Sequence, residues 1–220
     1  MNAHPPVPSL RLGTRGSPLA LAQARAVAAA IGGAVELITI TTSGDGGAPA
    51  GDKRRWVDRI EDALLAGEVD LAVHSAKDVP GLLADGLELA GAPRRADARD
   101  CLCGAGSLSE LASDARVGTS SLRRRSQLLA LRPDIAVVEL RGNVDTRLRK
   151  LAAGEVDAIV LACAGLERLD RTPGSPLDEL VPAVGQGTLA IEARVGDEAV
   201  AAALASGVDA TPPISSVTVP

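Results

Sequence analysis

The stretch ARVGTSSLRRRSQLLALR, residues 115–132, passes from a strand-like run through a polar turn into a run with helical spacing. Apolar residues near its start are typical of a buried strand, and the leucines of its second half recur at helical intervals. Thr119, Ser120 and Ser121 form the junction, where hydroxyl side chains and free N–H groups mark a helix start. The stretch therefore predicts one strand–turn–helix unit of an α/β fold.

The same alternation recurs along the chain and predicts an α/β protein with mostly parallel sheets. Near the N-terminus, Ser17 is a candidate N-cap and Pro18 takes the first helical position. A second series of units begins near Arg94. The expected strands are 9–14, 35–45 (ending in a polar turn), 70–75, 115–120, 136–142, 157–165 and 188–194, and the expected helices are 15–31, 54–67, 121–132, 143–154, 166–169 and 196–207.

Arginines recur at the starts of the expected helices. They are Arg15, the run Arg123 to Arg125, Arg141 with Arg147, and Arg168. Unpaired N–H groups at a helix start favour an anion, and open α/β sheets bind ligands outside the carboxyl ends of their strands. A single run of three arginines is usually a solvated face. Recurrence after successive strands instead favours a small ligand with several carboxylates or phosphates.

Composition limits the class of protein. The 220 residues, 46% of them hydrophobic, suit one large domain or two small ones with a true core. No stretch approaches the roughly 20 apolar residues of a membrane span, and the first residues lack the pattern of a secretory signal. We expect a cytoplasmic protein with no membrane contact, and the net charge of −5 argues against a nucleic-acid partner.

Two residue types are used unevenly. The basic residues are 20 Arg and 3 Lys, and Trp56 is the single aromatic residue among Phe, Tyr and Trp. A GC-rich genome accounts for much of this bias, but it does not explain where the arginines lie. Cys101, Cys103 and Cys163 match neither a disulfide framework nor a zinc ligand set, so we expect structural, buried thiols and no metal.

The stretch DLAVHSAKDVP, residues 70–80, places several polar side chains directly after a buried strand. His74, Ser75, Lys77 and Asp78 come together there, and Pro80 prevents further strand pairing. From these residues alone, a Lys–Asp pair that caps a turn is the default interpretation, ahead of a catalytic pair.

Seven segments resemble the hydroxymethylbilane synthase family, also called porphobilinogen deaminase. They are RLGTRGSPLALAQA, TTSGD, DLAVHSAKDVP, VGTSSLRRRSQL, VELRGNVDTRLRKL, DAIVLACAGLERL and VPAVGQGTLAIEAR, which follow one another within residues 9–194. The resemblance implies two α/β domains similar to type II periplasmic binding proteins, with the active cleft between them. It places the first domain at 1–94 and 188–220 and the second at 95–187, and we expect the family's third, α+β domain to be absent.

The resemblance also implies the chemistry. The family removes ammonia from porphobilinogen to give an electrophilic azafulvene, which a pyrrole carbon then attacks. Asp78 matches the catalytic aspartate, whose carboxylate holds the pyrrole N–H and stabilises positive charge as ammonia leaves. His74 is expected to be structural. The residues expected to bind the pyrrole substrate and its carboxylates are Arg15, Ser17, Asp45, Lys53, Trp56, Lys77, Thr119, Ser120, Ser121, Arg123, Arg124, Arg141, Arg147, Arg168 and Gln186.

The chain departs from the family in two places. None of its cysteines lies in a segment that resembles the loop to which the dipyrromethane primer is attached, so no covalent cofactor is expected, and a dipyrromethane held without a covalent bond stays open. The segment GGAPAGDKRRW, residues 46–56, is an altered version of the family's flap, with Trp56 in place of the usual Phe and Arg54 and Arg55 in place of Gly and Leu.

Three functions are compatible with these residues. The first is a shortened enzyme that deaminates porphobilinogen or a related aminomethylpyrrole and couples it to an acceptor, without a tethered primer. The second is true hydroxymethylbilane synthesis, with the primer held non-covalently or the third domain supplied by a partner chain. The third is a non-catalytic protein that binds pyrrole carboxylates.

Overall fold

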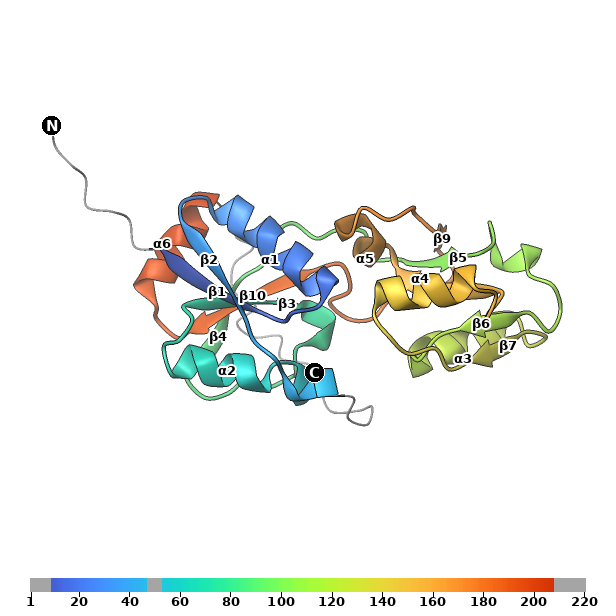
Figure 1. Cartoon of the computed structure of the whole chain (residues 1–220), viewed down its shortest axis with the longest axis horizontal. Helices are drawn as coiled ribbons and strands as arrows, with labels where there is room; N and C mark the ends of the chain where they lie inside the picture. Colours follow the sequence, from blue (N-terminus) through green and yellow to red (C-terminus); the bar gives the residue numbers. More distant parts are fainter. Residues whose placement is uncertain (1–8, 47–52, 208–220) are drawn as a thin grey trace, which may run out of the picture. The chain divides into compact units, whose positions relative to one another are not determined.

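The computed structural model describes residues 9–46 and 53–207, which form two compact units (Figure 1). Unit 1 contains the chain up to Arg95 and from Thr188 onward, and unit 2 contains Ala96–Gly187. Each unit has one five-stranded sheet with helices beside it, so the predicted α/β class is confirmed. The chain enters and leaves unit 2 at neighbouring points, because the Ala96 amide donates a hydrogen bond of 3.1 Å to the Gly187 carbonyl.

In the sheet of unit 1, four strands run in one direction and β10 alone runs in the other. Its order is β2 (Val35–Thr39), β1 (Leu10–Thr14), β3 (Leu71–Ser75), β10 (Leu189–Arg194) and β4 (Leu87–Gly91). Strand β1 runs parallel to β2 and β3, whereas β10 is antiparallel to both β3 and β4. The central strand β3 is therefore the one that leads into the Lys77–Asp78 pair.

Alternating side chains of β3 bury both faces of this sheet. Leu71 and Val73 pack in one core cluster with residues of α1 (Pro18–Ile31) and α6 (Glu198–Gly207), and Ala72 packs in another with α2 (Asp58–Leu65). The start of α1 is as predicted: the Ser17 hydroxyl accepts a hydrogen bond of 3.2 Å from the Ala20 amide, and Pro18 follows it. Such caps stabilise a helix by about 1 kcal/mol.

The single helix expected over 54–67 is instead divided. A 3₁₀ turn, η2 (Arg54–Trp56), precedes α2, and Val57 between them has φ −124° and ψ −20°, outside the α-helical region. Two further short turns follow strands of this unit: η1 (Ser43–Gly46) follows β2, and η3 (Ala76–Asp78) follows β3. Residues 47–52, which belong to the flap segment singled out in the sequence, lie outside the described residues.

Unit 2 repeats the arrangement of unit 1. Its sheet order is β7 (Ala136–Val138), β6 (Arg116–Gly118), β8 (Ala158–Ala162), β5 (Asp100–Cys103) and β9 (Ser175–Leu177). Strand β6 is parallel to β7 and β8, and β5 is antiparallel to β8 and β9. The remaining elements are α3 (Leu122–Leu131), α4 (Val144–Ala152), α5 (Cys163–Arg168) and the turn η4 (Leu108–Glu110).

Side-chain caps begin two of these helices. The Ser121 hydroxyl accepts a hydrogen bond of 3.4 Å from the Arg124 amide at the start of α3, and the Asn143 side chain accepts one of 2.8 Å from the Thr146 amide at the start of α4. Leu128 of α3 is buried in the cluster that contains Val117 of β6. The polar turn of residues 119–121 is thus fixed between a buried strand and a capped helix.

Candidate functional site

In unit 1, the predicted site residues gather at one edge of the sheet. Strands β1, β2 and β3 are parallel, so their carboxyl ends lie at the same edge, and β10 begins there because the Ala76 amide donates to the Thr188 carbonyl at 3.0 Å. Five predicted site residues come after these strand ends. They are Arg15 and Ser17 after β1, Asp45 in η1 after β2, and Lys77 and Asp78 in η3 after β3. An edge of this kind is where open α/β sheets bind ligands.

Lys77 and Asp78 are held on the short turn η3. The Val79 amide closes the turn by donating to the Ala76 carbonyl at 3.3 Å, and both Lys77 and Asp78 are half-buried. Ser75, just before the turn, accepts a hydrogen bond of 2.9 Å from the Gln23 amide group of α1. A turn fixed at both ends holds the ammonium and the carboxylate at the sheet edge.

Behind this turn lies a buried group of ionisable side chains. His74 Nε2 lies 2.9 Å from Glu192 Oε2, and both side chains are buried, which gives His74 the structural partner expected from the sequence. Glu61 is also buried. Burial and the nearby Glu192 charge raise the pKa of Glu61, although its bond to the Ala84 backbone and the charges of Arg54 and His74 oppose this.

Trp56 lies against two guanidinium groups. The Arg15 guanidinium carbon is 4.3 Å from the centre of the indole ring and that of Arg55 is 4.6 Å from it. The indole also lies so close to Gly44 that a Cβ there would overlap with it. These contacts join the end of β1, the turn η1 and the turn η2, while Lys53, just before η2, is exposed. Cation–π contacts of this kind stabilise by about 0.5–1 kcal/mol at partly exposed sites.

Unit 2 has a corresponding edge, where the parallel strands β6, β7 and β8 end. Thr119 is buried there, and its hydroxyl accepts a hydrogen bond of 3.2 Å from the Ser121 amide. Ser120 is exposed beside it and accepts a bond of 3.4 Å from Arg147, whose Nε donates to the Gly142 carbonyl at 2.8 Å. The hydroxyl run and Arg147 are therefore neighbours at this edge.

Arg123 and Arg124 converge on Asp100, the first residue of β5. Arg124 donates from Nε at 3.0 Å and from Nη2 at 2.6 Å to Oδ1 of Asp100, and Arg123 donates from Nη2 at 2.7 Å to Oδ2. Gln186 adds a fourth bond, from Nε2 to Oδ1 at 2.9 Å, and also donates to the Ala98 carbonyl at 2.7 Å. Asp100 was not among the residues predicted from the sequence, although an acidic residue beside the apolar run CLC was a signal for it.

The charges of this edge act on one another. Burial alone would raise the pKa of Asp100, but the Arg124 charge and the hydrogen bonds from both arginines and Gln186 bring it below its usual value. Burial, and then the charge of Arg124, lowers the pKa of Arg147. Because guanidinium groups titrate far above neutral pH, Arg147 stays charged.

The other two predicted arginines of unit 2 have separate partners. Arg141 is exposed and pairs with Glu139 at 2.7 Å. Arg168 is half-buried, burial lowers its pKa, and its Nη2 donates to the Gly187 carbonyl at 2.7 Å. The structure thus brings Ser120, Arg123, Arg124, Arg147 and Gln186 into one neighbourhood. Arg168 contacts the residue that follows Gln186, and Arg141 pairs with Glu139 instead.

The three cysteines are poorly placed to react. Cys101 and Cys103 are buried on β5. Their contact, together with burial, raises the pKa of Cys101, and the same contact lowers the pKa of Cys103, so it is burial that shields Cys103 from reaction. Burial, with the neighbouring Cys101 and Asp97, raises the pKa of Cys163 to about 12. Because the thiolate is the nucleophile, Cys101 and Cys163 are weak nucleophiles at neutral pH. Over residues 9–46 and 53–207, no group of His, Cys, Asp and Glu side chains is arranged to hold a metal ion.

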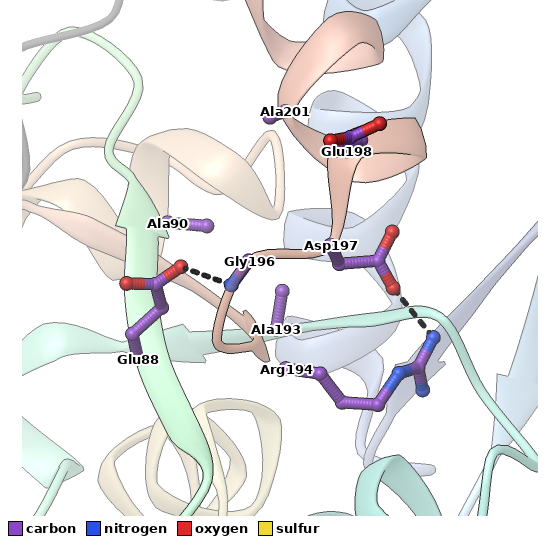
Figure 2. Close-up of a pocket in the computed structure, with 8 residues that line it drawn as sticks. All are labelled: Glu88, Ala90, Ala193, Arg194, Gly196, Asp197, Glu198 and Ala201. Carbon is purple, nitrogen blue, oxygen red and sulfur yellow. Dashed lines mark hydrogen bonds and ion pairs between the residues drawn. The ribbon is translucent and has the colours of Figure 1, made fainter.

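A pocket of about 290 Å³ opens in unit 1 away from these residues (Figure 2). Its carboxylates are Glu88 of β4, which accepts a bond of 3.3 Å from the Gly196 amide, Asp197, which pairs with Arg194 at 2.7 Å, and Glu198. It contains none of the predicted site residues, and three carboxylates against one guanidinium disfavour an anion. Among the described helices, none has the length and apolar character needed to span a membrane.

Comparison with known proteins extends over most of the chain. The family model described as "Porphobilinogen deaminase, dipyromethane cofactor binding domain" matches residues 10–202. A porphobilinogen deaminase of Leifsonia xyli subsp. xyli is 49% identical over 204 residues, which make up 86% of this chain and 62% of that protein. One of Roseiflexus sp. is 52% identical over 213 residues, 90% of this chain and 70% of that protein.

Solved structures confirm the fold class. A periplasmic substrate-binding protein of an ABC transporter from Coxiella burnetii superposes with a TM-score of 0.53 at 16% identity, covering 90% of this chain and 91% of that one. The predicted similarity to type II periplasmic binding proteins is thereby confirmed for the fold. Because the family match runs from β1 into α6 and includes every strand end that carries a predicted site residue, the chain belongs to the porphobilinogen deaminase family.

Proposed function

We propose that this chain deaminates porphobilinogen and couples the resulting pyrrole unit to an acceptor, as a transferase of tetrapyrrole biosynthesis. The observation that carries the proposal is the position of Lys77 and Asp78 on a fixed turn after the central strand β3, in a chain of the porphobilinogen deaminase family. The chain spans 62% of the length of the Leifsonia relative, so the activity of the whole enzyme is a proposal for this chain.

Asp78 is the proposed catalytic residue. Its carboxylate accepts the pyrrole N–H of porphobilinogen and stabilises the positive charge that develops on the ring as the carbon–nitrogen bond of the aminomethyl group breaks. The aminomethyl group reacts in its ammonium form, so the bonding pair leaves with the nitrogen as neutral ammonia and the ring becomes a protonated azafulvene, whose positive charge Asp78 stabilises. A pyrrole carbon of the acceptor then attacks the exocyclic methylene carbon and loses its proton. Lys77 binds a substrate carboxylate beside Asp78.

The remaining predicted residues hold the substrate. In unit 1, Arg15, Ser17, Asp45 and Lys53 belong to this proposed set, and Trp56 is proposed to stack on a pyrrole ring. Each charge-assisted hydrogen bond to a carboxylate contributes about 1.5–3 kcal/mol, so a few of them orient a small diacid. In unit 2, the proposed residues are Thr119, Ser120, Ser121, Arg123, Arg141, Arg147 and Arg168. Arg124 and Gln186, which were predicted with them, donate to Asp100 instead.

The donor set also fits a dipyrromethane, because such a group carries carboxylate side chains and the edge of unit 2 presents guanidinium and hydroxyl groups beside one another. When bound, a dipyrromethane supplies the pyrrole carbon that accepts the incoming unit. We propose that Arg123 and Arg147 bind its carboxylates and that no cysteine of this chain is bonded to it. Cys101 and Cys103 are buried, and the raised pKa of Cys163 keeps that thiol protonated.

The test is ammonia release from porphobilinogen by the purified chain and by Asp78→Asn. We expect the wild-type chain to release ammonia and the substitution to lower the rate by at least about 100-fold, as is typical when a group that stabilises transition-state charge is removed. Asp85→Asn is the matched control, because Asp85 is an exposed carboxylate a few residues beyond the turn. Equal rates in wild type and Asp78→Asn would remove Asp78 from its role.

The products separate the finer possibilities. A short pyrrole product with an unchanged protein mass supports untethered coupling, and uroporphyrinogen I supports full hydroxymethylbilane synthesis, because the linear tetrapyrrole closes spontaneously. Tight binding of porphobilinogen without ammonia would mean a non-catalytic binding protein. A mass increase by pyrrole units, traced to one of the three cysteines by peptide mass, would identify that cysteine as an anchor and overturn the untethered form.

A further inference from the structure

Asp100 is the most completely buried acidic group at the edge of unit 2. Its side chain has no solvent exposure, and it begins strand β5, opposite Ala162 at the carboxyl end of β8. A buried carboxylate is costly unless hydrogen bonds and opposite charges compensate for the lost water. Four donated hydrogen bonds, from Arg123, Arg124 and Gln186, provide that compensation.

The two arginines that share Asp100 are placed very differently. Arg124 is 6% exposed, and its remaining Nη1 donates to the Val160 carbonyl at 2.9 Å, so its guanidinium is used within the unit. The Arg123 side chain is 27% exposed, and it is held between Asp100 and the Val181 carbonyl. Gln186, 1% exposed, is likewise used within the unit. Arg123 is therefore the member of this group that can reach a ligand.

The charge of the neighbourhood is unbalanced. Within residues 9–46 and 53–207, Asp100 is the one carboxylate that forms an ion pair with Arg123 or Arg124. Arg147 forms no ion pair with a carboxylate of these residues. Arg147 is close enough to Arg124 for the charge of Arg124 to lower its pKa. Three guanidinium groups thus accompany one carboxylate, and the excess of positive charge favours a bound anion.

We propose that Asp100 is a positioning residue for the anion site of unit 2. It fixes the planar guanidinium of Arg123 so that one edge of it faces a ligand carboxylate, together with Arg147 and Ser120. Arg124 and Gln186 act through Asp100 and do not touch the ligand. This assignment rests on the proposed function for the identity of the ligand, a pyrrole with carboxylate side chains, and it revises the direct binding role predicted for Arg124 and Gln186.

The test compares Asp100→Asn with the wild-type chain. Asparagine has nearly the same shape but carries no charge and turns N–H groups toward guanidinium donors, so Arg123 loses its fixed orientation. We expect the KM for porphobilinogen and its Kd by calorimetry to rise about 10- to 100-fold, with little change in kcat, because the lost contacts bind ground state and transition state alike. A purely structural role would lower the Tm and leave KM unchanged.

Asp134→Asn is the matched control. Asp134 pairs with Arg132 at 2.7 Å just beyond the opposite end of α3, so this variant removes an Arg–Asp pair beside the same helix without touching Asp100. Its KM is expected to equal that of wild type. An unchanged KM and Kd in a folded Asp100→Asn protein would overturn the proposal.

A second variant covers the case in which Asp100→Asn does not fold. Asp100→Leu combined with Arg124→Met replaces the buried pair by apolar side chains, which buried ion pairs often tolerate. Arg123 still lacks its carboxylate partner, so the same rise in the Kd is expected, and a Kd equal to that of wild type contradicts the proposal.

Binding of glutarate, a plain dicarboxylate, is measured to distinguish failure of this proposal from failure of the proposed function. A wild-type chain that binds glutarate or porphobilinogen without releasing ammonia overturns only the deaminase activity, and the effect of Asp100→Asn on either Kd still decides the role of Asp100. A wild-type chain that binds neither overturns both.

Discussion

The guanidinium of Arg15 lies 4.3 Å from the ring centre of Trp56, so a residue after strand β1 is joined to the turn that precedes α2. Both residues belong to the proposed substrate set. Because the chain contains one Trp and no Tyr or Phe, the intrinsic fluorescence of the protein comes from Trp56 alone and reports on its surroundings.

Trp56 emission is therefore expected to change when a pyrrole or carboxylate ligand binds. A ligand carboxylate that pairs with Arg15 draws the guanidinium from the indole, and a stacked pyrrole alters the surroundings of the ring. The measurement is a fluorescence titration with porphobilinogen, with Arg15→Ala as the comparison, which should shift the emission before ligand is added. Binding seen by calorimetry without any change of emission would place the ligand away from Trp56.

Glu61 is expected to make the stability of the chain depend on pH. Its pKa is raised in the folded state by burial and by Glu192, so the folded state resists its ionisation more than the unfolded state does. Below the pKa that Glu61 has in the unfolded state, its ionisation does not affect the free energy of unfolding. As pH rises from that value through the higher pKa of the folded state, the free energy of unfolding falls. The free energy of unfolding of Glu61→Gln, compared with that of wild type, should therefore increase between about pH 4 and neutral pH. Urea unfolding at several pH values measures the difference, and Glu68→Gln, at an exposed position, should show no such trend.

The side-chain cap of α4 is expected to affect the stability of the protein and not the residues of the proposed site. The Asn143 side chain accepts the Thr146 amide at 2.8 Å, so Asn143→Ala should lower the free energy of unfolding by about 1 kcal/mol. Asn143→Asp keeps an acceptor at the same place and should retain most of the stability. Equal losses in the two variants, measured by urea unfolding, would show that the cap is not the cause.

The thiols should react slowly in the native protein. Cys101 and Cys103 are buried, and the pKa of Cys163 is about 12, which leaves little thiolate at neutral pH. A disulfide reagent such as dithionitrobenzoate should modify all three thiols at once in denaturant but none rapidly without it. Rapid reaction of one native thiol, located by peptide mass, would reopen that cysteine as a site for covalent attachment.

Local patterns were sufficient for much of the fold. The strand–turn–helix units of residues 9–31 and 115–132 were predicted because strand and helix periodicity and N-cap residues are short-range signals. Strands β4, β5 and β9 were missed, and the antiparallel direction of β10 was not evident. Direction depends on which strands pair, and β5 pairs with β8, more than 50 residues later in the chain.

The candidate site divides in the same way. The arginines and the Lys77–Asp78 pair were found because they follow strands in the sequence. Asp100 was missed because its partners are distant: Arg124 is 24 residues away and Gln186 is 86 residues away. Nor could the sequence tell which of two adjacent arginines is buried, since this is decided by which one the helix α3 turns toward β5 and β8.

The hydrogen bond between Ala96 and Gly187 means that unit 2 starts and finishes at the same point. A module with touching ends can be inserted in a host sheet at a low entropic cost of loop closure, because its insertion hardly changes the distance between the two host segments. Unit 2 is thus a module whose insertion leaves strand β10 in reach of its place between β3 and β4 of the host sheet.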